Sequence, residues 1–192
     1  MFLGIDDEKF LRQEKIPMTK REIRILTLVL ANVNDAEIIV DIGAGTGSLS
    51  IEAALFSPDS NIFAIEKNPD AVELLKQNIQ KFSVDNITVL QDEASKALKN
   101  FSAIDVAIIG GSGGKLEKIL DIVDEKLKIG GHISANFISI QNLSTCLDWL
   151  KRRENYHYDA IQVQINRLKK IGHYDIAQAN NPIYILTAKK KE

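Results

Sequence analysis

The residues best suited to chemistry form one glycine-rich stretch, Asp41-Ile42-Gly43-Ala44-Gly45-Thr46-Gly47, directly after a short β-branched run. Glycine lets a backbone turn with positive φ and pass close to a ligand. The free N–H groups of a following helix add a positive dipole end. Glu66 closes the next apolar run, where a carboxylate can accept hydrogen bonds from both hydroxyls of a ribose. The pattern predicts a site for a nucleoside-containing cofactor.

The spacing of the glycines distinguishes between cofactor classes. A nicotinamide site has the pattern G-x-G-x-x-G, and Ser48 stands where its third glycine belongs. Gly-x-Gly-x-Gly after an acidic residue is typical of S-adenosylmethionine sites instead. No Walker lysine pattern is present, which disfavours nucleoside triphosphates. The alternatives are a nicotinamide or flavin site and a tight turn without a ligand, and Glu66 at the strand end argues against the second.

The elements that must position this loop alternate along the chain. Thr19 and Glu22 form a capping-box pattern that predicts a helix beginning at Thr19. Asn68 and Pro69 are the expected cap and first residue of another helix. Gly130-Gly131 is expected to end a helix. Strands are predicted at 37–43, 61–66, 86–90, 104–110 and 132–138, and helices at 45–56, 69–82, 94–98, 115–128 and 141–153.

After these five strand–helix units the alternation stops. Two further strands are expected at 158–168 and 182–190, with no helical pattern between them. This order predicts an α/β fold, with a Rossmann-like seven-stranded sheet that is mostly parallel and has an antiparallel edge. The ligand site of such a sheet lies at the carboxyl ends of the strands, near the first strand–helix turn. Residues 1–192 are expected to form one domain, with 1–18 as a lead segment.

Composition excludes several classes of protein. The chain has 192 residues, a formal net charge of −2 and a single cysteine. Near-neutral charge disfavours a nucleic-acid partner, and one cysteine disfavours a disulfide framework or a cysteine-based metal site. No apolar run reaches the roughly 18 residues of a membrane helix, and the first residues do not read as a signal peptide. We therefore expect a cytoplasmic protein without a metal ligand set.

The motifs together resemble one family, the decarboxylating precorrin C15-methyltransferases of cobalamin biosynthesis, in their free-standing form. The resemblance rests on the stretches 17–22, 41–47, 64–69, 109–114 and 130–136, of which PMTK and GGSGG are the most telling. It implies the class I methyltransferase fold. It further implies methylation of cobalt-precorrin-6B at C15 by S-adenosylmethionine, with loss of CO₂ from an acetate arm.

The resemblance also implies site residues and partners. The implied cofactor contacts are Thr19, Gly43, Ala44, Gly45, Thr46, Gly47, Glu66, Glu93 and Ala94. The family has Gly-Asp-Ala-Pro where this chain has Asp92-Glu93-Ala94-Ser95. The implied partners are an anionic tetrapyrrole and, in a homotetramer, further copies of the chain.

An anionic macrocycle calls for a cationic pocket. Two clusters of basic residues could supply it, one at 20–24 and one at 167–173. The candidate substrate contacts are Lys20, Arg24, Ser112, Asn136 and Arg167. The residues offer no compact acid–base pair for the loss of CO₂, and no catalytic base is identified. The open alternatives are a class I methyltransferase acting on RNA or a protein side chain, and a non-enzymatic S-adenosylmethionine-binding module.

Overall fold

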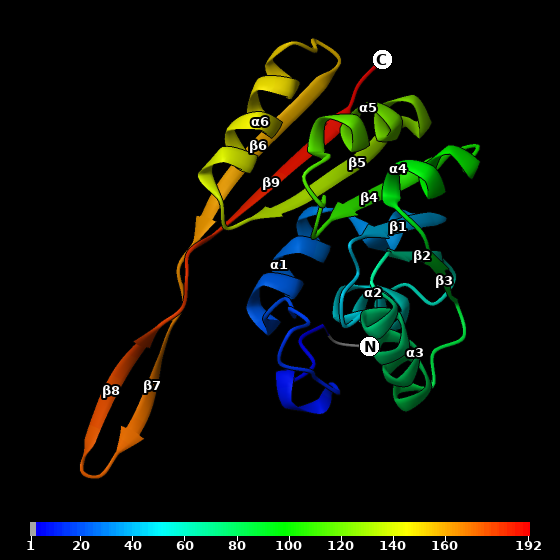
Figure 1. The fold of residues 1–192 in the computed structure, drawn as a ribbon. Coiled ribbons are helices and arrows are strands. Elements are labelled where there is room, and N and C mark those ends of the chain that lie inside the picture. The colour runs from blue at the N-terminus through cyan, green and yellow to red at the C-terminus, as the bar shows by residue number, and fades with distance from the viewer. Residues whose placement is uncertain (1–2) are drawn as a thin grey trace.

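The central element of the computed structural model, which describes residues 3–192, is a seven-stranded sheet with the order β3-β2-β1-β4-β5-β9-β6 (Figure 1). Strands β1 to β5 pair in parallel, and β9 runs antiparallel to both of its neighbours. The predicted fold class is confirmed, although the antiparallel strand lies one place inside the edge. Met1 and Phe2 of the predicted lead segment lie outside the described residues.

The strands and helices alternate as the sequence predicts. The strands are β1 (Ile38–Ile42), β2 (Asn61–Glu66), β3 (Ile87–Gln91), β4 (Ile104–Ile109), β5 (Leu127–Phe137), β6 (Tyr156–Val163), β7 (Asn166–Ile171), β8 (Tyr174–Ala179) and β9 (Ile183–Lys190). The helices are α1 (Arg21–Leu30), α2 (Ser48–Phe56), α3 (Pro69–Phe82), α4 (Ala94–Ala97), α5 (Leu116–Lys126) and α6 (Ile140–Lys151). Among residues 3–192, no helix combines the length and the apolar character that crossing a bilayer requires.

Helices cover both faces of the sheet (Figure 1). Helices α1 to α3 lie on one face and α4 to α6 on the other. Successive residues of a strand point to opposite faces, so Val40 and Ile42 join the core under α5 and α6 while Ile39 joins the core under α1 and α2. Burial on both faces explains why β1 and β4 are rich in Ile and Val instead of alternating between apolar and polar residues.

The start of one helix follows the local sequence, and the start of another does not. The Asn68 side chain accepts the N–H of Asp70, and Pro69 is the first residue of α3, which confirms the predicted cap. Helix α1 begins at Arg21 rather than Thr19, and no side chain at its own N-cap holds it. The N–H of Arg21 is donated to Asp7 Oδ1, 3.0 Å away. A distant carboxylate thus replaces the predicted capping box.

The glycine pair near residue 130 was expected to end a helix, and that prediction is wrong. Helix α5 ends at Lys126, and β5 begins at once and includes Gly130-Gly131. The register of β5 against β4 breaks between Leu127 and His132. The extra residues form an irregularity in the strand, where glycine is tolerated.

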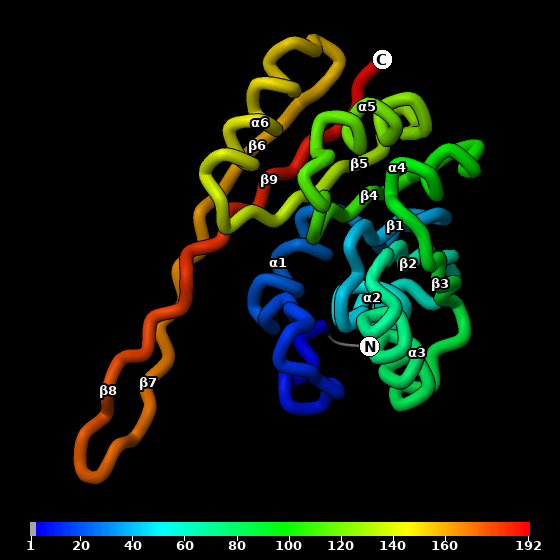
Figure 2. Tube along the Cα trace, viewed as in Figure 1, coloured from blue at the N-terminus to red at the C-terminus, as the bar shows by residue number. Residues whose placement is uncertain are grey.

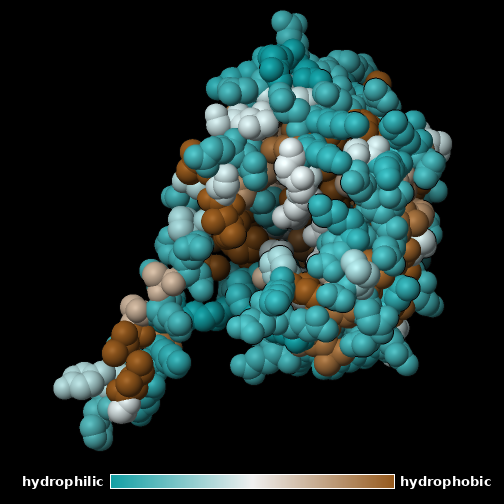
Figure 3. Space-filling model, in the orientation of Figure 1, coloured by the Kyte–Doolittle hydropathy of each residue, from teal (hydrophilic) through white to brown (hydrophobic). Residues whose placement is uncertain are grey.

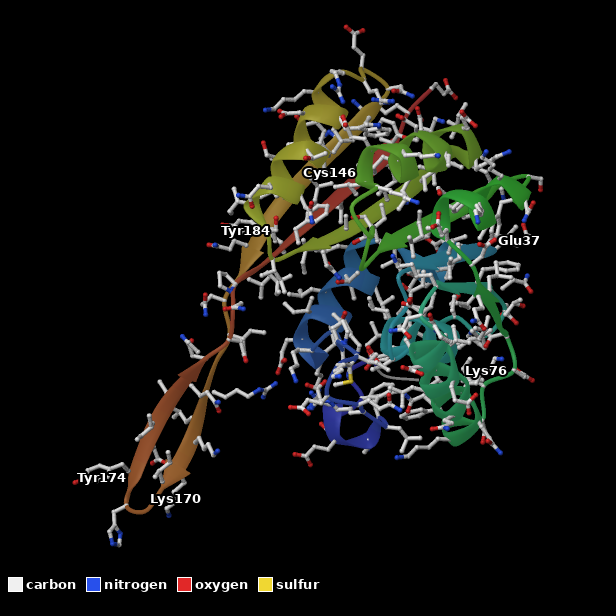
Figure 4. The ribbon with its side chains drawn as sticks, viewed as in Figure 1. Glu37, Lys76, Cys146, Lys170, Tyr174 and Tyr184 are labelled. Atoms are coloured by element: carbon white, nitrogen blue, oxygen red, sulfur yellow. The ribbon has the colours of Figure 1, made fainter. Side chains whose placement is uncertain are left out.

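A projecting hairpin is the main feature that the sequence pattern did not predict. The expected strand 158–168 divides into β6 and β7, and β7 pairs with β8 outside the main sheet. Figure 2 shows the two chain segments running side by side from the body to the hairpin. Every residue of β7 and β8 is exposed. Lys170 and Tyr174 lie near its tip, away from the body (Figure 4).

Candidate functional site

The glycine loop connects β1 to α2 at the carboxyl end of β1, between two other loops. A Cβ at Gly43 would lie 2.7 Å from the backbone oxygen of Gly111, in the loop that follows β4. A Cβ at Gly45 would lie 2.9 Å from the carbonyl oxygen of Pro17. Both glycines have positive φ, 75° and 55°. Only residues without a side chain therefore allow the three segments to meet here.

The first cavity has a volume of about 310 Å³ and lies at the carboxyl ends of β1, β2, β3 and β4. Glu66 lines it at the end of β2. Its Oε2 accepts the N–H of Gly45 at 3.0 Å, and its Oε1 accepts those of Lys67 and Asn68 at 2.8 and 2.9 Å. These bonds fix the carboxylate at the mouth of the glycine loop. Each carboxylate oxygen has more than one acceptor direction, so Glu66 retains capacity for hydroxyl donors of a ligand.

The opposite wall of the first cavity is formed by the turn after β3, which includes Glu93 and Ala94. Lys115 Nζ lies 2.7 Å from Glu93 Oε2 and joins this turn to the loop after β4. The ammonium of Lys115 holds the pKa of the Glu93 carboxyl below its usual value. The ion pair of Glu93 and Lys115 thus bounds the cavity on this side.

The remaining residues of the glycine motif have other surroundings. Thr46 is buried, and its carbonyl oxygen accepts a hydrogen bond from Asn78 of α3 at 2.9 Å. A Cβ at Gly47 would lie 1.9 Å from Leu75 Cδ1, so this glycine is required for the packing of α2 against α3. Ala44 and Thr19 line the second cavity, described below, rather than the first.

Asp41 is buried beneath the glycine loop. Its Oδ2 accepts the Ser50 hydroxyl at 2.6 Å. Burial raises the pKa of Asp41 to about 6, although hydrogen bonds from Ser50 oppose the shift. Asp41 thus connects β1 to the first turn of α2.

A second cavity of about 450 Å³ adjoins the first. Pro17, Gly43 and Gly110 line both cavities, so a shared wall separates them. The second cavity extends from this wall to the end of β5 and the base of the hairpin, where Phe137, Ile138, Val163, Ile165 and Ile183 line it. Figure 3 shows hydrophobic surface at the base of the hairpin, beside a hollow in the body.

The predicted substrate contacts do not all lie together. Lys20 and Asn136 line the second cavity, and Ser112 lines the first. Arg24 is 0% exposed, with Nε 3.1 Å from Glu52 Oε1 and Nη1 2.7 Å from Asp7 Oδ1. Because its donors are used within the protein, Arg24 holds the N-terminal segment against α1 and α2 rather than facing a ligand.

Arg167 also lies outside both cavities and pairs with Glu22 of α1, with Nη2 2.5 Å from Oε1. The other cations of that cluster are on the hairpin, beyond Arg167. Within residues 3–192, the two predicted clusters therefore do not come together to form a cationic pocket. Among the described residues, Lys20 is the one lysine or arginine that lines the second cavity.

The N-terminal segment contributes more to the site than the sequence pattern indicated. Lys15 and Ile16 line the first cavity, Met18 and Thr19 line the second, and Pro17 lines both. Ile16 packs on Ala71 and Leu74 of α3. The segment has no helical or strand period, so Pro17 and the PMTK motif were its only sequence signals.

Comparison with known proteins identifies the family. A family model described as a precorrin methyltransferase domain matches residues 10–190. The chain belongs to the precorrin methyltransferase family. The probable cobalt-precorrin-6B C(15)-methyltransferase (decarboxylating) of Sulfurisphaera tokodaii is 41% identical over 189 residues, which cover 97% of each chain. The corresponding enzyme of Salmonella typhimurium is 38% identical over 186 residues, 97% of this chain and 96% of that one.

Solved structures of this family share the fold. A precorrin-6y C5,15-methyltransferase from Geobacter metallireducens superposes with a TM-score of 0.91 at 36% identity, over 98% of this chain and 97% of that one. A precorrin 8w decarboxylase from Methanobacterium thermoautotrophicum superposes with a TM-score of 0.87 at 28% identity, over 97% of this chain and 98% of that one. A SAM-dependent O-methyltransferase from Thermotoga maritima, 16% identical, shares the fold alone, with a TM-score of 0.77 over 94% of this chain and 69% of that one.

Proposed function

We propose that this member of the precorrin methyltransferase family methylates cobalt-precorrin-6B at C15 with S-adenosylmethionine and removes an acetate carboxyl group as CO₂. The observation that carries the proposal is the pair of cavities that meet at Pro17, Gly43 and Gly110. One cavity has the features of a nucleoside site, and the other is larger and mostly apolar. A methyl donor and a bulky acceptor can therefore face each other across a wall of small residues. Enzymes named for this reaction are 41% and 38% identical to the chain over nearly its full length, which supports the assignment.

The first cavity fits S-adenosylmethionine. Gly43 and Gly45 clear the space that side chains would fill, and Glu66 presents a carboxylate for the ribose hydroxyls. Ala94 and Glu93 lie beside it, where an adenine base is expected. S-adenosylmethionine supplies, when bound, a methyl group on a sulfonium that a carbon nucleophile can take. Thr46 and Gly47 support the loop through Asn78 and Leu75 rather than by lining the cavity.

The second cavity is proposed to hold the macrocycle, with C15 toward the shared wall. Its apolar residues suit the ring, and Lys20 and Asn136 offer polar contacts to carboxylate arms. Holding donor and acceptor in line removes the entropic cost of their encounter, an effect of up to about 7–11 kcal/mol. Orientation by these walls thus provides most of what the methyl transfer requires from the protein.

We further propose that the chain acts in the cytoplasm as one methyltransferase domain, assembled into a homotetramer. The hairpin of β7 and β8 supports the assembly, because Leu168 and Tyr174 on it are 73% and 74% exposed. An isolated two-stranded hairpin is marginally stable in water. Contact with further copies would cover its apolar side chains, and a light-scattering mass near a single chain would refute the tetramer.

Two experiments test the proposal. S-adenosylmethionine should raise the melting temperature while NAD leaves it unchanged, because the first cavity matches one cofactor and not the other. Mass spectrometry after incubation with cobalt-precorrin-6B and S-adenosylmethionine should show gain of one methyl group and loss of CO₂. Binding of S-adenosylmethionine without any change in the macrocycle would refute the substrate and favour RNA or a protein side chain as the methyl acceptor.

A further inference from the structure

The residue that orients the departing carboxyl group is not evident from the sequence, and the second cavity contains a candidate for it. Asn136 lies at the end of β5 and lines this cavity. Its amide nitrogen is buried and has no hydrogen-bond partner among residues 3–192. An unpaired buried donor is costly, so such groups in a cavity mark positions where a ligand completes the bonding.

The other half of the same amide is held in place. Thr27 Oγ1 lies 3.1 Å from Asn136 Oδ1 and 2.7 Å from the carbonyl oxygen of Ile23, and shares its single proton between them. Thr27 is fully buried in α1. The contact holds the amide group of Asn136 against α1, and with Oδ1 toward Thr27 the N–H₂ end of Asn136 is left for a ligand acceptor.

The surroundings of Asn136 are apolar and carry little charge. Ile23, Phe137 and Ile183 line the same cavity. Within the described part of the chain, Lys20 is the one charged residue of its lining, and Asp7 lies 3.6 Å from its ammonium. The Lys20 side chain is 41% exposed, so this charge lies near solvent. Asn142, Asn180 and Asn181 also line the cavity but are exposed, unlike Asn136.

These features suit the loss of CO₂. The bond between the arm's methylene carbon and the carboxylate breaks, its electron pair enters the conjugated macrocycle, and a proton from solvent later completes the new methyl group. Negative charge leaves the carboxylate in this step, so a cation beside it would stabilise the starting state more than the transition state. A neutral amide in an apolar wall orients the carboxylate without that effect.

We infer that Asn136, oriented by Thr27, holds the acetate carboxylate that this enzyme removes. The inference rests on the proposed function and deepens it. It assigns a positioning role in CO₂ loss to Asn136 and leaves methyl transfer to the shared wall of the two cavities. The retained carboxylates of the macrocycle are then directed toward Lys20 and solvent.

The test separates the two halves of the reaction. Asn136→Leu removes the donor and keeps the number of side-chain heavy atoms, and Asn136→Asp replaces the amide with a carboxylate of the same charge sign as the substrate arm. In both variants, CO₂ release should fall about tenfold or more relative to methyl transfer, since a hydrogen bond to a charged group is lost. Mass spectrometry should then detect product that has gained a methyl group but kept its carboxyl group. Thr27→Val should shift the ratio in the same direction by a smaller factor.

The control is Asn100→Leu, which removes an exposed amide between α4 and β4, outside both cavities, and should leave the ratio of CO₂ to methyl transfer unchanged. The inference is overturned if Asn136→Leu slows both steps equally or slows neither. The proposed function fails separately, if the wild-type protein neither methylates nor decarboxylates the macrocycle. Melting temperatures and S-adenosylmethionine affinity distinguish a folding defect from either result.

Discussion

Replacement of Gly43 by alanine tests the geometry on which both cavities depend. The new Cβ would lie 2.7 Å from the oxygen of Gly111 and 2.8 Å from its nitrogen and Cα. These are backbone atoms, so no side chain can rotate away. The loop after β1 and the loop after β4 would have to separate. Both loops line the first cavity, and we expect S-adenosylmethionine binding to fall sharply.

The magnitude has two parts. Alanine at a left-handed φ costs about 1–2 kcal/mol of folding free energy. Overpacking against fixed atoms adds about 1–3 kcal/mol. Gly130→Ala is the matched control, because Gly130 has a similar φ of 82° and its Cβ would meet nothing within 4 Å among the described residues. Gly130→Ala should therefore lose only the folding free energy that alanine costs at a left-handed φ.

Urea denaturation followed by the fluorescence of Trp149, the one tryptophan in the sequence, measures both losses of stability. Isothermal titration calorimetry measures the affinity for S-adenosylmethionine. We expect Gly43→Ala to be about 1–3 kcal/mol less stable than Gly130→Ala. Equal losses in the two variants, with cofactor affinity unchanged in both, would refute the argument that the two loops meet too closely for a side chain.

Three further predictions concern one charged residue of the site and two buried charged residues that support it. Glu66→Gln should weaken S-adenosylmethionine binding by about 1–3 kcal/mol in calorimetry, since an amide replaces half of the acceptors; unchanged affinity would exclude Glu66 as the ribose contact. Arg24→Met should destabilise the fold by about 3–5 kcal/mol in urea, because buried Glu52 loses its partner, and adding Glu52→Gln should restore part of the loss. Asp41→Asn should change the pH dependence of stability. Folding raises the pKa of this carboxyl from 3.8 to about 6, so the wild type should lose stability relative to the variant as pH rises through that interval, by about 3 kcal/mol at most. Parallel stability curves from pH 4 to 7 would contradict the burial of an ionisable Asp41.

The sequence was informative wherever a short stretch of chain decides the outcome. The β-branched runs at β1 and β4, the Asn68-Pro69 start of α3 and the glycine loop follow from periodicity, capping and the lack of a side chain. Glu66 could be placed at the end of β2 because it directly follows the last apolar residue of that run. These features gave the fold class and the first cavity with most of its predicted residues.

The second cavity depends on contacts between distant residues, and the sequence did not place it. It brings together the segment before α1, the end of β5 and the base of the hairpin. The division of the predicted strand 158–168 into β6 and β7 depends on β9, which pairs with β6 but not with β7. No local pattern marks that change of partner.

Arg24 shows the same limit for a single residue. In the sequence it reads as one of three neighbouring cations at the start of a helix, available to an anionic ligand. In the structure Glu52 and Asp7 meet its guanidinium and bury it. The sequence by itself determined the fold class, the cofactor loop and the family pattern, because these depend on neighbours in the chain. Only the tertiary structure decided which charges face a ligand, because that depends on residues that folding brings together from far apart.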